Sequence, residues 1–288
     1  MADVAAENLE AQEAWNGVLF DRFVQYRHIV IDGLAPHGDE AMRVAPPRRG
    51  DRVLDIGCGF GDTTRELARL VGQEGSAFGV DIAPRFVAIA ESEAALAAVG
   101  NVRFAVHDVQ MTTFDETFDY AFSRFGIMFF DNPVWALRNV HAALEPSGRL
   151  CAVVWRRRID NPWMYKAEVV VKPLLEPEED ANEPRCGPGP FSMADADTVT
   201  GQLLSAGFDE IALRRCDRNL TFGRTLDEAI EMNLALGPAA EALRLAGEGG
   251  AALRPHLEEL LRGALAEFVQ EDGSVAAQAS TWIVTARA

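Results

Sequence analysis

Short apolar runs alternate with amphipathic stretches through the central part of the chain. The runs typical of buried strands are residues 52–56, 77–80, 102–106, 120–123 and 150–155. Between them, apolar residues at helical spacing indicate helices over residues 63–71, 84–99 and 133–144. Strands that alternate with helices of this length predict a parallel, doubly wound sheet.

The chain follows other patterns on either side of this unit. Residues 15–34 have the apolar spacing of one amphipathic helix, and a basic connector that contains Pro46 and Pro47 follows at 43–51. Residues 161–190 are rich in proline, with an acidic run at 176–180, and predict an irregular excursion that begins with one short helix. The remaining expected elements are helices at 194–205, 225–236 and 251–270 and strands at 211–222 and 279–286.

These elements predict an α/β protein with a seven-stranded, doubly wound (Rossmann-like) sheet whose last strand is antiparallel. N-terminal helices precede the sheet, and a helical insert precedes the last strand. We expect an N-terminal helical segment and connector at 1–50, a main domain at 51–224 and 273–288, and the insert at 225–272. The insert and the loop at 161–190 lie outside the sheet, so we expect them to build the pocket for the molecule on which the protein acts, or a contact between two copies of the chain.

Composition narrows the possible partners. The formal net charge of −17 disfavours binding to phosphate backbones and anionic lipid surfaces. A small neutral or cationic molecule is therefore a more favourable partner than nucleic acid or a membrane. The four cysteines form no C-x-x-C pair and have no suitably placed histidine, so we predict neither a metal site nor a disulfide framework. The absence of a secretory signal and of a long apolar run predicts a cytoplasmic protein.

A glycine-rich turn follows the first predicted strand. Residues 53–61 read VLDIGCGFG and place glycines at 57, 59 and 61 before a helix. Glycine allows positive φ angles and close approach of a ligand to the backbone, and the helix offers free N–H groups. This pattern alone also fits a dinucleotide whose pyrophosphate binds at the helix terminus.

Carboxylates at three successive strand ends make the ligand more specific. Asp55 would repel a pyrophosphate but suits the cationic α-amino group of S-adenosylmethionine, the alternative being a capping or turn aspartate. Asp81 can accept hydrogen bonds from both ribose hydroxyls, in NAD enzymes and methyltransferases alike. Asp108 can bind the adenine amino group beside a backbone N–H, although by itself it is also typical of a turn. Ligands of open α/β sheets bind at these strand ends.

The next strand brings further side chains to the same edge. It delivers Ser123 and Arg124, followed by apolar residues that can wall a pocket or pack in the core: Phe125, Met128, Phe129 and Phe130.

Residues 53–155 resemble the seven-stranded class I S-adenosylmethionine-dependent methyltransferase domain. The matching motifs are VLDIGCGFG, GVDI, HDV, FSRFGIMFF and LEPSGRLCAVVW. The chain is similar in particular to small-molecule methyltransferases of the UbiE-like superfamily, and its FSRFGIMFF and NPW (161–163) stretches look characteristic of one bacterial branch. The resemblance specifies fold and cofactor but not the acceptor, because that superfamily methylates carbon, oxygen, nitrogen and arsenic.

The resemblance also implies roles for individual residues. Gly57, Cys58 and Gly59 would pass close to the methionine part of the cofactor. Asp81 with Ile82 would frame the ribose, Asp108 with Val109 the adenine, and the backbone of Ser123 would hold the methionine amine. The N-terminal helices would cover the cofactor as a lid that brings Trp15, Phe20 or His28 near the site, with structural packing an equal alternative for Trp15 and Phe20.

Methyl transfer is an in-line displacement, so alignment and exclusion of water are the main expected catalytic contributions. A base is needed only if the acceptor loses a proton; His28 is the candidate, with an ordinary surface histidine as the alternative. Residues that can either contact the acceptor or belong to the scaffold are Arg124, Trp155, Trp163 and Tyr165.

Two other functions share some of these features. An NAD-dependent oxidoreductase would use the glycine turn and Asp81 but gives no role to Asp55 or to a third acid. A cofactor-binding protein without turnover would have no need to keep all three acids.

Overall fold

The computed structural model describes residues 8–174 and 189–288 of the chain. The predicted acidic run at 176–180 and Cys186 lie outside the described residues. The strands are β1 (Arg52–Ile56), β2 (Ser76–Asp81), β3 (Val102–Val106), β4 (Phe118–Arg124), β5 (Leu144–Trp155), β6 (Asp209–Gly223) and β7 (Val275–Arg287). The α-helices are α1 (Leu9–Asn16), α2 (Val18–Gln25), α3 (Ala35–Val44), α4 (Asp62–Val71), α5 (Pro84–Leu96), α6 (Pro133–Ala143), α7 (Pro162–Val171), α8 (Ala196–Ala206), α9 (Leu226–Leu236), α10 (Pro238–Ala246) and α11 (Gly250–Leu265).

All the strands belong to one seven-stranded sheet in the order β3-β2-β1-β4-β5-β7-β6. Strands β1 to β5 pair in parallel, whereas β7 is antiparallel to both β5 and β6. The predicted α/β fold, with seven strands and an antiparallel last strand, is confirmed. Because β1 to β5 run in the same direction, their carboxyl ends lie at one edge of the sheet.

Alternation along the strands divides the core into two layers. Val53 and Leu54 are adjacent on β1 and both fully buried, but their side chains point to opposite faces. Val53 packs in the layer covered by α3 and α4, and Leu54 packs in the layer that includes residues of α6 and α8. Burial on both faces is typical of a parallel sheet and explains the continuous apolar runs in the sequence.

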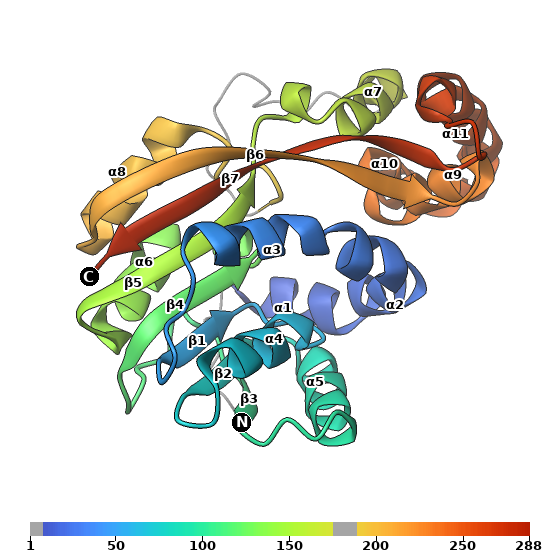
Figure 1. The fold of residues 1–288 in the computed structure, drawn as a ribbon. Helices are drawn as coiled ribbons and strands as arrows, with labels where there is room; N and C mark the ends of the chain where they lie inside the picture. The colour runs from blue at the N-terminus through green and yellow to red at the C-terminus, as the bar shows by residue number, and fades with distance from the viewer. Residues whose placement is uncertain (1–7, 175–188) are drawn as a thin grey trace.

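The last two strands extend beyond the rest of the sheet. The segment of β7 from Thr281 to Arg287 pairs with β5, while residues 275–280 pair with β6 and not with β5. This two-stranded extension carries α9, α10 and α11, which lie at its far end in Figure 1. The helices α1 and α2 lie between that group and α5 (Figure 1). The predicted division into lid, main domain and insert stays a prediction.

The N-terminal segment differs from its prediction. The single helix expected at 15–34 is wrong: α1 ends at Asn16, α2 begins at Val18, and His28–Gly33 forms a π-helix. Gly17 lies between the helices with φ −112° and ψ −112°, far from helical values, and a Cβ there would lie 2.9 Å from the Glu13 carbonyl oxygen. A glycine therefore allows the break.

Two helices were missing from the prediction. α3 precedes the proline connector, and α10 lies between the two helices that were predicted for the insert. Each has proline in its first turn, a position where proline is tolerated. No helix in residues 8–174 or 189–288 combines the length and apolar character needed to cross a membrane.

Candidate active site

A cavity of about 450 Å³ opens at the carboxyl edge of the sheet. The part of its wall that carries the carboxylates, called here the polar half, comes from the ends of β1 and β2, the loop after β3 and the start of α4. The other half is apolar and comes from the N-terminal helices, the loop after β4, the end of β5, α7, β6 and α9. Residues of the apolar half include Leu34, Phe125, Met128, Phe129, Phe130, Trp155, Trp163, Met164, Leu220, Met232 and Leu236.

The glycine-rich turn forms the floor of the polar half. Gly57, Gly59 and Gly61 all have positive φ, between 52° and 72°. A Cβ on Gly57 would lie 2.8 Å from the Cα of Gly126, whereas one on Gly59 would meet nothing within 4 Å. The close approach at Gly57 lets the turn and the loop after β4 form one continuous surface. The open space at Gly59 leaves room for a ligand against the backbone.

Asp55 lies at the cavity wall and is otherwise enclosed by protein. It is 1% exposed, and its Oδ2 accepts a hydrogen bond from the Thr64 hydroxyl at 2.6 Å. Burial raises the pKa of Asp55 to about 7, against the lowering effect of the Thr64 hydrogen bond. Thr64 is a neutral donor, and no arginine or lysine among the described residues forms an ion pair with Asp55.

Asp81 connects the glycine turn to the start of α5. Its Oδ2 accepts the backbone N–H of Gly59 at 3.0 Å, and its Oδ1 accepts that of Ala83 at 3.0 Å. Burial raises the pKa of Asp81, and these backbone bonds oppose the effect. Each carboxylate oxygen can accept more than one hydrogen bond, so both can still receive hydroxyl donors from the cavity. Ile82 lines the cavity beside it.

Asp108 is held from two sides. It is 3% exposed; its Oδ1 accepts the Gln110 N–H at 3.0 Å, and its Oδ2 accepts the side-chain amide of Asn8 at 2.8 Å. Val109 follows it on the cavity wall. The structure thus brings Asp55, Asp81 and Asp108 to the wall of one cavity, as their positions in the sequence predicted.

The end of β4 contributes one buried and one charged residue. Ser123 is fully buried; its hydroxyl donates to the Ile56 carbonyl at 2.8 Å, and it is not among the cavity-lining residues. Arg124 lines the cavity and donates through Nη2 to Asp62 Oδ2 at 2.7 Å. Cys58 also lines the cavity, and burial raises the pKa of its thiol well above its ordinary value, which keeps it neutral.

The apolar half is built around stacked aromatic rings. Phe125 stacks on Trp155 with centroids 4.5 Å apart, and Trp163 stacks on Phe222 at 5.3 Å. Phe125 has φ 60°, a strained conformation for a residue with a Cβ. The surrounding structure therefore holds Phe125 in a conformation that it would not adopt alone, and this places its ring on the cavity wall.

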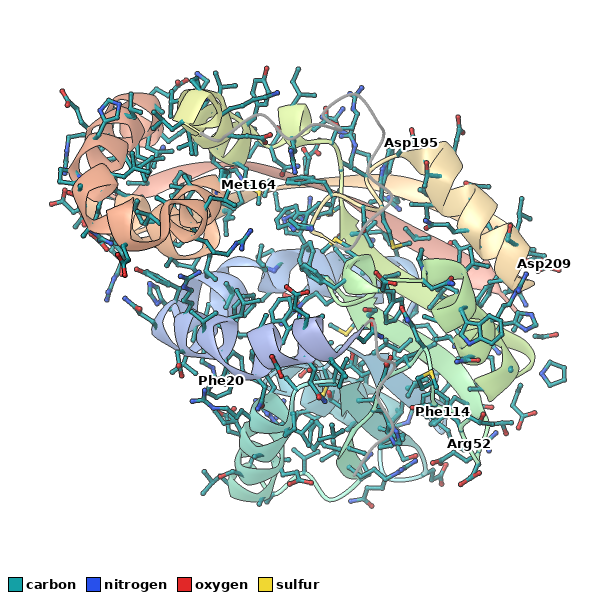
Figure 2. The ribbon with its side chains drawn as sticks, turned by 180° about the vertical axis from the view of Figure 1, so that it is seen from behind. Phe20, Arg52, Phe114, Met164, Asp195 and Asp209 are labelled. Carbon is teal, nitrogen blue, oxygen red and sulfur yellow. The ribbon has the colours of Figure 1, made fainter. Side chains whose placement is uncertain are left out.

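The N-terminal helices close one side of the cavity, where the resemblance placed a lid. Trp15 lines the cavity. Phe20 is labelled in Figure 2 and packs instead with Phe86 of α5, at 4.9 Å between centroids. Arg27 holds the end of this segment to α5 through two hydrogen bonds to Glu93, of 2.5 and 2.7 Å.

The histidines lie differently from expectation. His28 is not among the cavity-lining residues, and its Nε2 lies 3.2 Å from Glu228 Oε1. His37, for which no role was predicted, is fully buried with Nδ1 3.0 Å from the Thr281 hydroxyl. Its ring packs edge-on near Phe125 and Trp155. The proposed base function of His28 stays a prediction.

Sequence reasoning also missed two polar residues of the cavity wall. Asn8 binds Asp108 across 100 residues of sequence, and no local pattern signals such a contact. Asp62 directly follows Gly61 as the first residue of α4, so its place at the cavity could have been inferred from the glycine motif. Tyr165, considered as an acceptor contact, is 39% exposed and not among the lining residues.

Comparisons with known proteins agree with this geometry. A family model described as a methyltransferase domain matches residues 53–148. The UbiE ubiquinone/menaquinone biosynthesis C-methyltransferase of Teredinibacter turnerae is 33% identical over 170 residues, which cover 56% of this chain and 68% of that protein. The aklanonic acid methyltransferase DauC of Streptomyces sp. (strain C5) is 31% identical over 126 residues, covering 43% of this chain and only 57% of DauC.

Solved structures share the fold at lower identity. The YcgJ protein of Bacillus subtilis has a TM-score of 0.56 at 16% identity, with 89% of this chain and 97% of that chain covered. A methyltransferase candidate from Bacillus halodurans C-125 has a TM-score of 0.57 at 17% identity, with 87% and 97% covered. The sequence matches, taken with the carboxylate-lined cavity, establish that the chain belongs to the class I S-adenosylmethionine-dependent methyltransferases, in the UbiE-like branch that transfers the methyl group of this cofactor to small-molecule acceptors.

Proposed function

We propose that S-adenosylmethionine binds in the polar half of the cavity, with its adenosine along Asp81, Ile82, Asp108 and Val109. The carboxyl group of Asp81 retains acceptor capacity toward ribose hydroxyls, and Asp108 with Val109 is proposed to lie beside the adenine. Both lie at strand ends on one cavity wall, the place where open α/β sheets bind nucleotides.

The methionine part is proposed to pass over Gly57, Cys58 and Gly59 toward Asp55. The raised pKa of Asp55 supports this placement, because a cationic amine in contact with the enclosed carboxylate would favour its charged form. The backbone of Ser123 is proposed as a further partner of the amine. The residues named so far would bind the ribose, the adenine and the methionine amine. When bound, the cofactor would supply a methyl group that is activated by its sulfonium.

The acceptor is proposed to be a largely apolar molecule that contains a ring system and binds in the aromatic half of the cavity. The observation that carries this proposal is the wall itself: Trp155, Phe125 and Trp163 present aromatic surface continuous with the carboxylate-lined half. The names of two relatives support it, since one is an aklanonic acid methyltransferase and another a C-methyltransferase of ubiquinone/menaquinone biosynthesis. Trp155 and Trp163 are the proposed acceptor contacts.

Catalysis is proposed to come from alignment and exclusion of water. The lid and the aromatic wall would hold an acceptor atom in line with the methyl group, and their apolar surface would keep water out of the reaction. A base such as His28 would act only for an acceptor that must lose a proton.

The test is a methyl-transfer assay with labelled S-adenosylmethionine on pairs of acceptors that share one ring system. One member of each pair is neutral and the other carries a sulfonate. We expect transfer to neutral ring-containing acceptors and little to their sulfonated partners. Preference for the charged members would reject the proposed acceptor class. Tight binding of S-adenosylhomocysteine without transfer across the panel would instead favour the cofactor-binding protein without turnover.

We further propose a cytoplasmic location and a homodimer. The described cysteines 58, 151 and 216 are free and buried, which suits a reducing compartment. Val169 of α7 is exposed at 49% and offers apolar surface for a second copy. Sedimentation equilibrium of the wild type and of Val169→Glu would test the dimer, which should dissociate in the variant.

A further inference from the structure

Charge is distributed unevenly along the cavity wall. Four carboxyl side chains line it, from Asp55, Asp62, Asp81 and Asp108. Among the described residues that line it, Arg124 is the one arginine or lysine. Within the described part of the chain, an anionic group that enters this cavity therefore has Arg124 as its one permanently cationic partner.

The guanidinium of Arg124 is fixed but not saturated. Its side chain is 12% exposed, and Nη2 binds Asp62 Oδ2 at 2.7 Å. A guanidinium has five N–H donors, and the others make no hydrogen bond to a described residue. Gly38 of α3 packs on its stem so closely that a Cβ at Gly38 would lie 3.0 Å from the Arg124 Cδ. The stem is thereby held, and donors remain for a ligand.

Arg124 and Asp55 lie on neighbouring strands, so both can contact the same end of a ligand. Arg124 lies at the end of β4, the strand that pairs with β1, which carries Asp55. The two side chains are near enough for the arginine to lower the pKa of Asp55, against the larger effect of burial. The cavity thus presents a carboxylate and a guanidinium on neighbouring strands, an arrangement complementary to an amino acid with its ammonium and carboxylate charges.

A carboxylate removed from water is strongly disfavoured unless a cation or several donors bind it. The methionine part of the proposed cofactor carries such a carboxylate. We propose that Arg124 is a cofactor-binding residue whose guanidinium receives the methionine carboxylate, while Asp55 faces the methionine amine. This inference rests on the proposed function, and it moves Arg124 from the acceptor to the cofactor.

The experiment measures by calorimetry how tightly two ligands bind to the wild type and to an Arg124 variant. The two ligands are S-adenosylhomocysteine and S-adenosyl-3-thiopropylamine, which differ only in the carboxylate. The wild type should bind the first about 10- to 100-fold more tightly, the range for a hydrogen bond to a charged group. Arg124→Met should bring that ratio close to one by weakening the first ligand and leaving the second nearly unchanged. A ratio that persists in Arg124→Met overturns the inference.

A matched control comes from another arginine. Arg149 forms an ion pair of the same 2.7 Å length with Asp51 but does not line the cavity, so Arg149→Met should keep the wild-type ratio. If Arg124→Met does not fold, Arg124→Lys and Arg124→Gln replace it, and lysine should retain a larger ratio than glutamine. Equal ratios in those two variants would overturn the inference. A wild type that binds neither ligand contradicts the proposed function itself, a result distinct from binding with an unchanged ratio.

Discussion

The side-chain amide of Asn8 donates a hydrogen bond to Asp108 Oδ2 at 2.8 Å. This contact joins the N-terminal segment to the strand end where we propose that adenine binds. Gln12, one turn further along, donates to the Ile82 carbonyl at 2.9 Å. Two amides of the N-terminal segment therefore bind this edge of the sheet, and we propose that these contacts slow the exit of a bound nucleoside.

The first prediction concerns these two amides. Each hydrogen bond contributes about 1 kcal/mol, so losing both in the double variant Asn8→Ala with Gln12→Ala should speed dissociation of S-adenosylhomocysteine by about 30-fold. Stopped-flow displacement measures this rate, and Gln25→Ala, which removes an amide from α2 of the same lid, should leave it unchanged. Tighter binding in the double variant would instead mean that Asn8 competes with adenine for Asp108.

Asp81 should be the most sensitive position for the adenosine part. Asp81→Ala removes the proposed ribose acceptor and also leaves the Gly59 and Ala83 N–H groups without their partner. We expect a loss of about 1–3 kcal/mol in cofactor binding together with a lower melting temperature. Calorimetric titration with S-adenosylhomocysteine measures the affinity, and an unchanged affinity would refute the ribose assignment.

Cofactor affinity should depend on pH through Asp55. The pKa of this group is raised to about 7 in the free protein, and a bound cation favours its charged form, so binding should release protons near neutral pH. Affinity should then weaken as the pH falls below 7, by at most about tenfold per pH unit. Calorimetry at pH 8, 7 and 6 in buffers of different ionisation enthalpy measures both effects. Asp55→Asn should abolish both the proton release and the pH dependence of affinity. An affinity of the wild type that does not change with pH would contradict the proposal that Asp55 faces the methionine amine.

His37 should make the fold sensitive to acid. Burial lowers its pKa to about 4 from an ordinary value of 6.5, so between these values the unfolded chain binds a proton that the folded chain does not. Stability should therefore fall as the pH drops from 6.5 toward 4, by at most about 1.4 kcal/mol per unit from this group.

Urea unfolding of the wild type and of His37→Phe between pH 7 and 5 isolates this contribution. As the pH falls, the free energy of unfolding of the wild type should decrease relative to that of His37→Phe. Asp55 titrates in the opposite sense, because its raised pKa lets the folded chain bind a proton first, and it contributes equally to both proteins. Parallel stability curves would exclude His37 as the source.

The sequence predicted the cofactor half better than the lid. Asp55, Asp81 and Asp108 lie at or just beyond the carboxyl ends of short, mainly apolar runs, so local pattern and the geometry of parallel strands placed them together without knowledge of tertiary contacts. His37 could not be recognised in this way, because its partner Thr281 lies 244 residues further along. A histidine on an amphipathic helix appears exposed until the strand that covers it is known. The break at Gly17 was missed because the apolar spacing continues across it.

The acceptor half gives the last prediction. Met164 of α7, labelled in Figure 2, lines the apolar half and belongs to none of the proposed cofactor contacts. Met164→Trp adds bulk to that wall, so kcat/KM for a ring-containing acceptor should fall by more than about tenfold, a loss of at least about 1.4 kcal/mol in transition-state binding. Affinity for S-adenosylhomocysteine should not change. Tyr165→Trp places the same side chain at the next, exposed position and should leave both quantities as in the wild type. If the two tryptophan variants lose activity equally, the damage lies in α7 as a whole, and the apolar half is not where the acceptor binds.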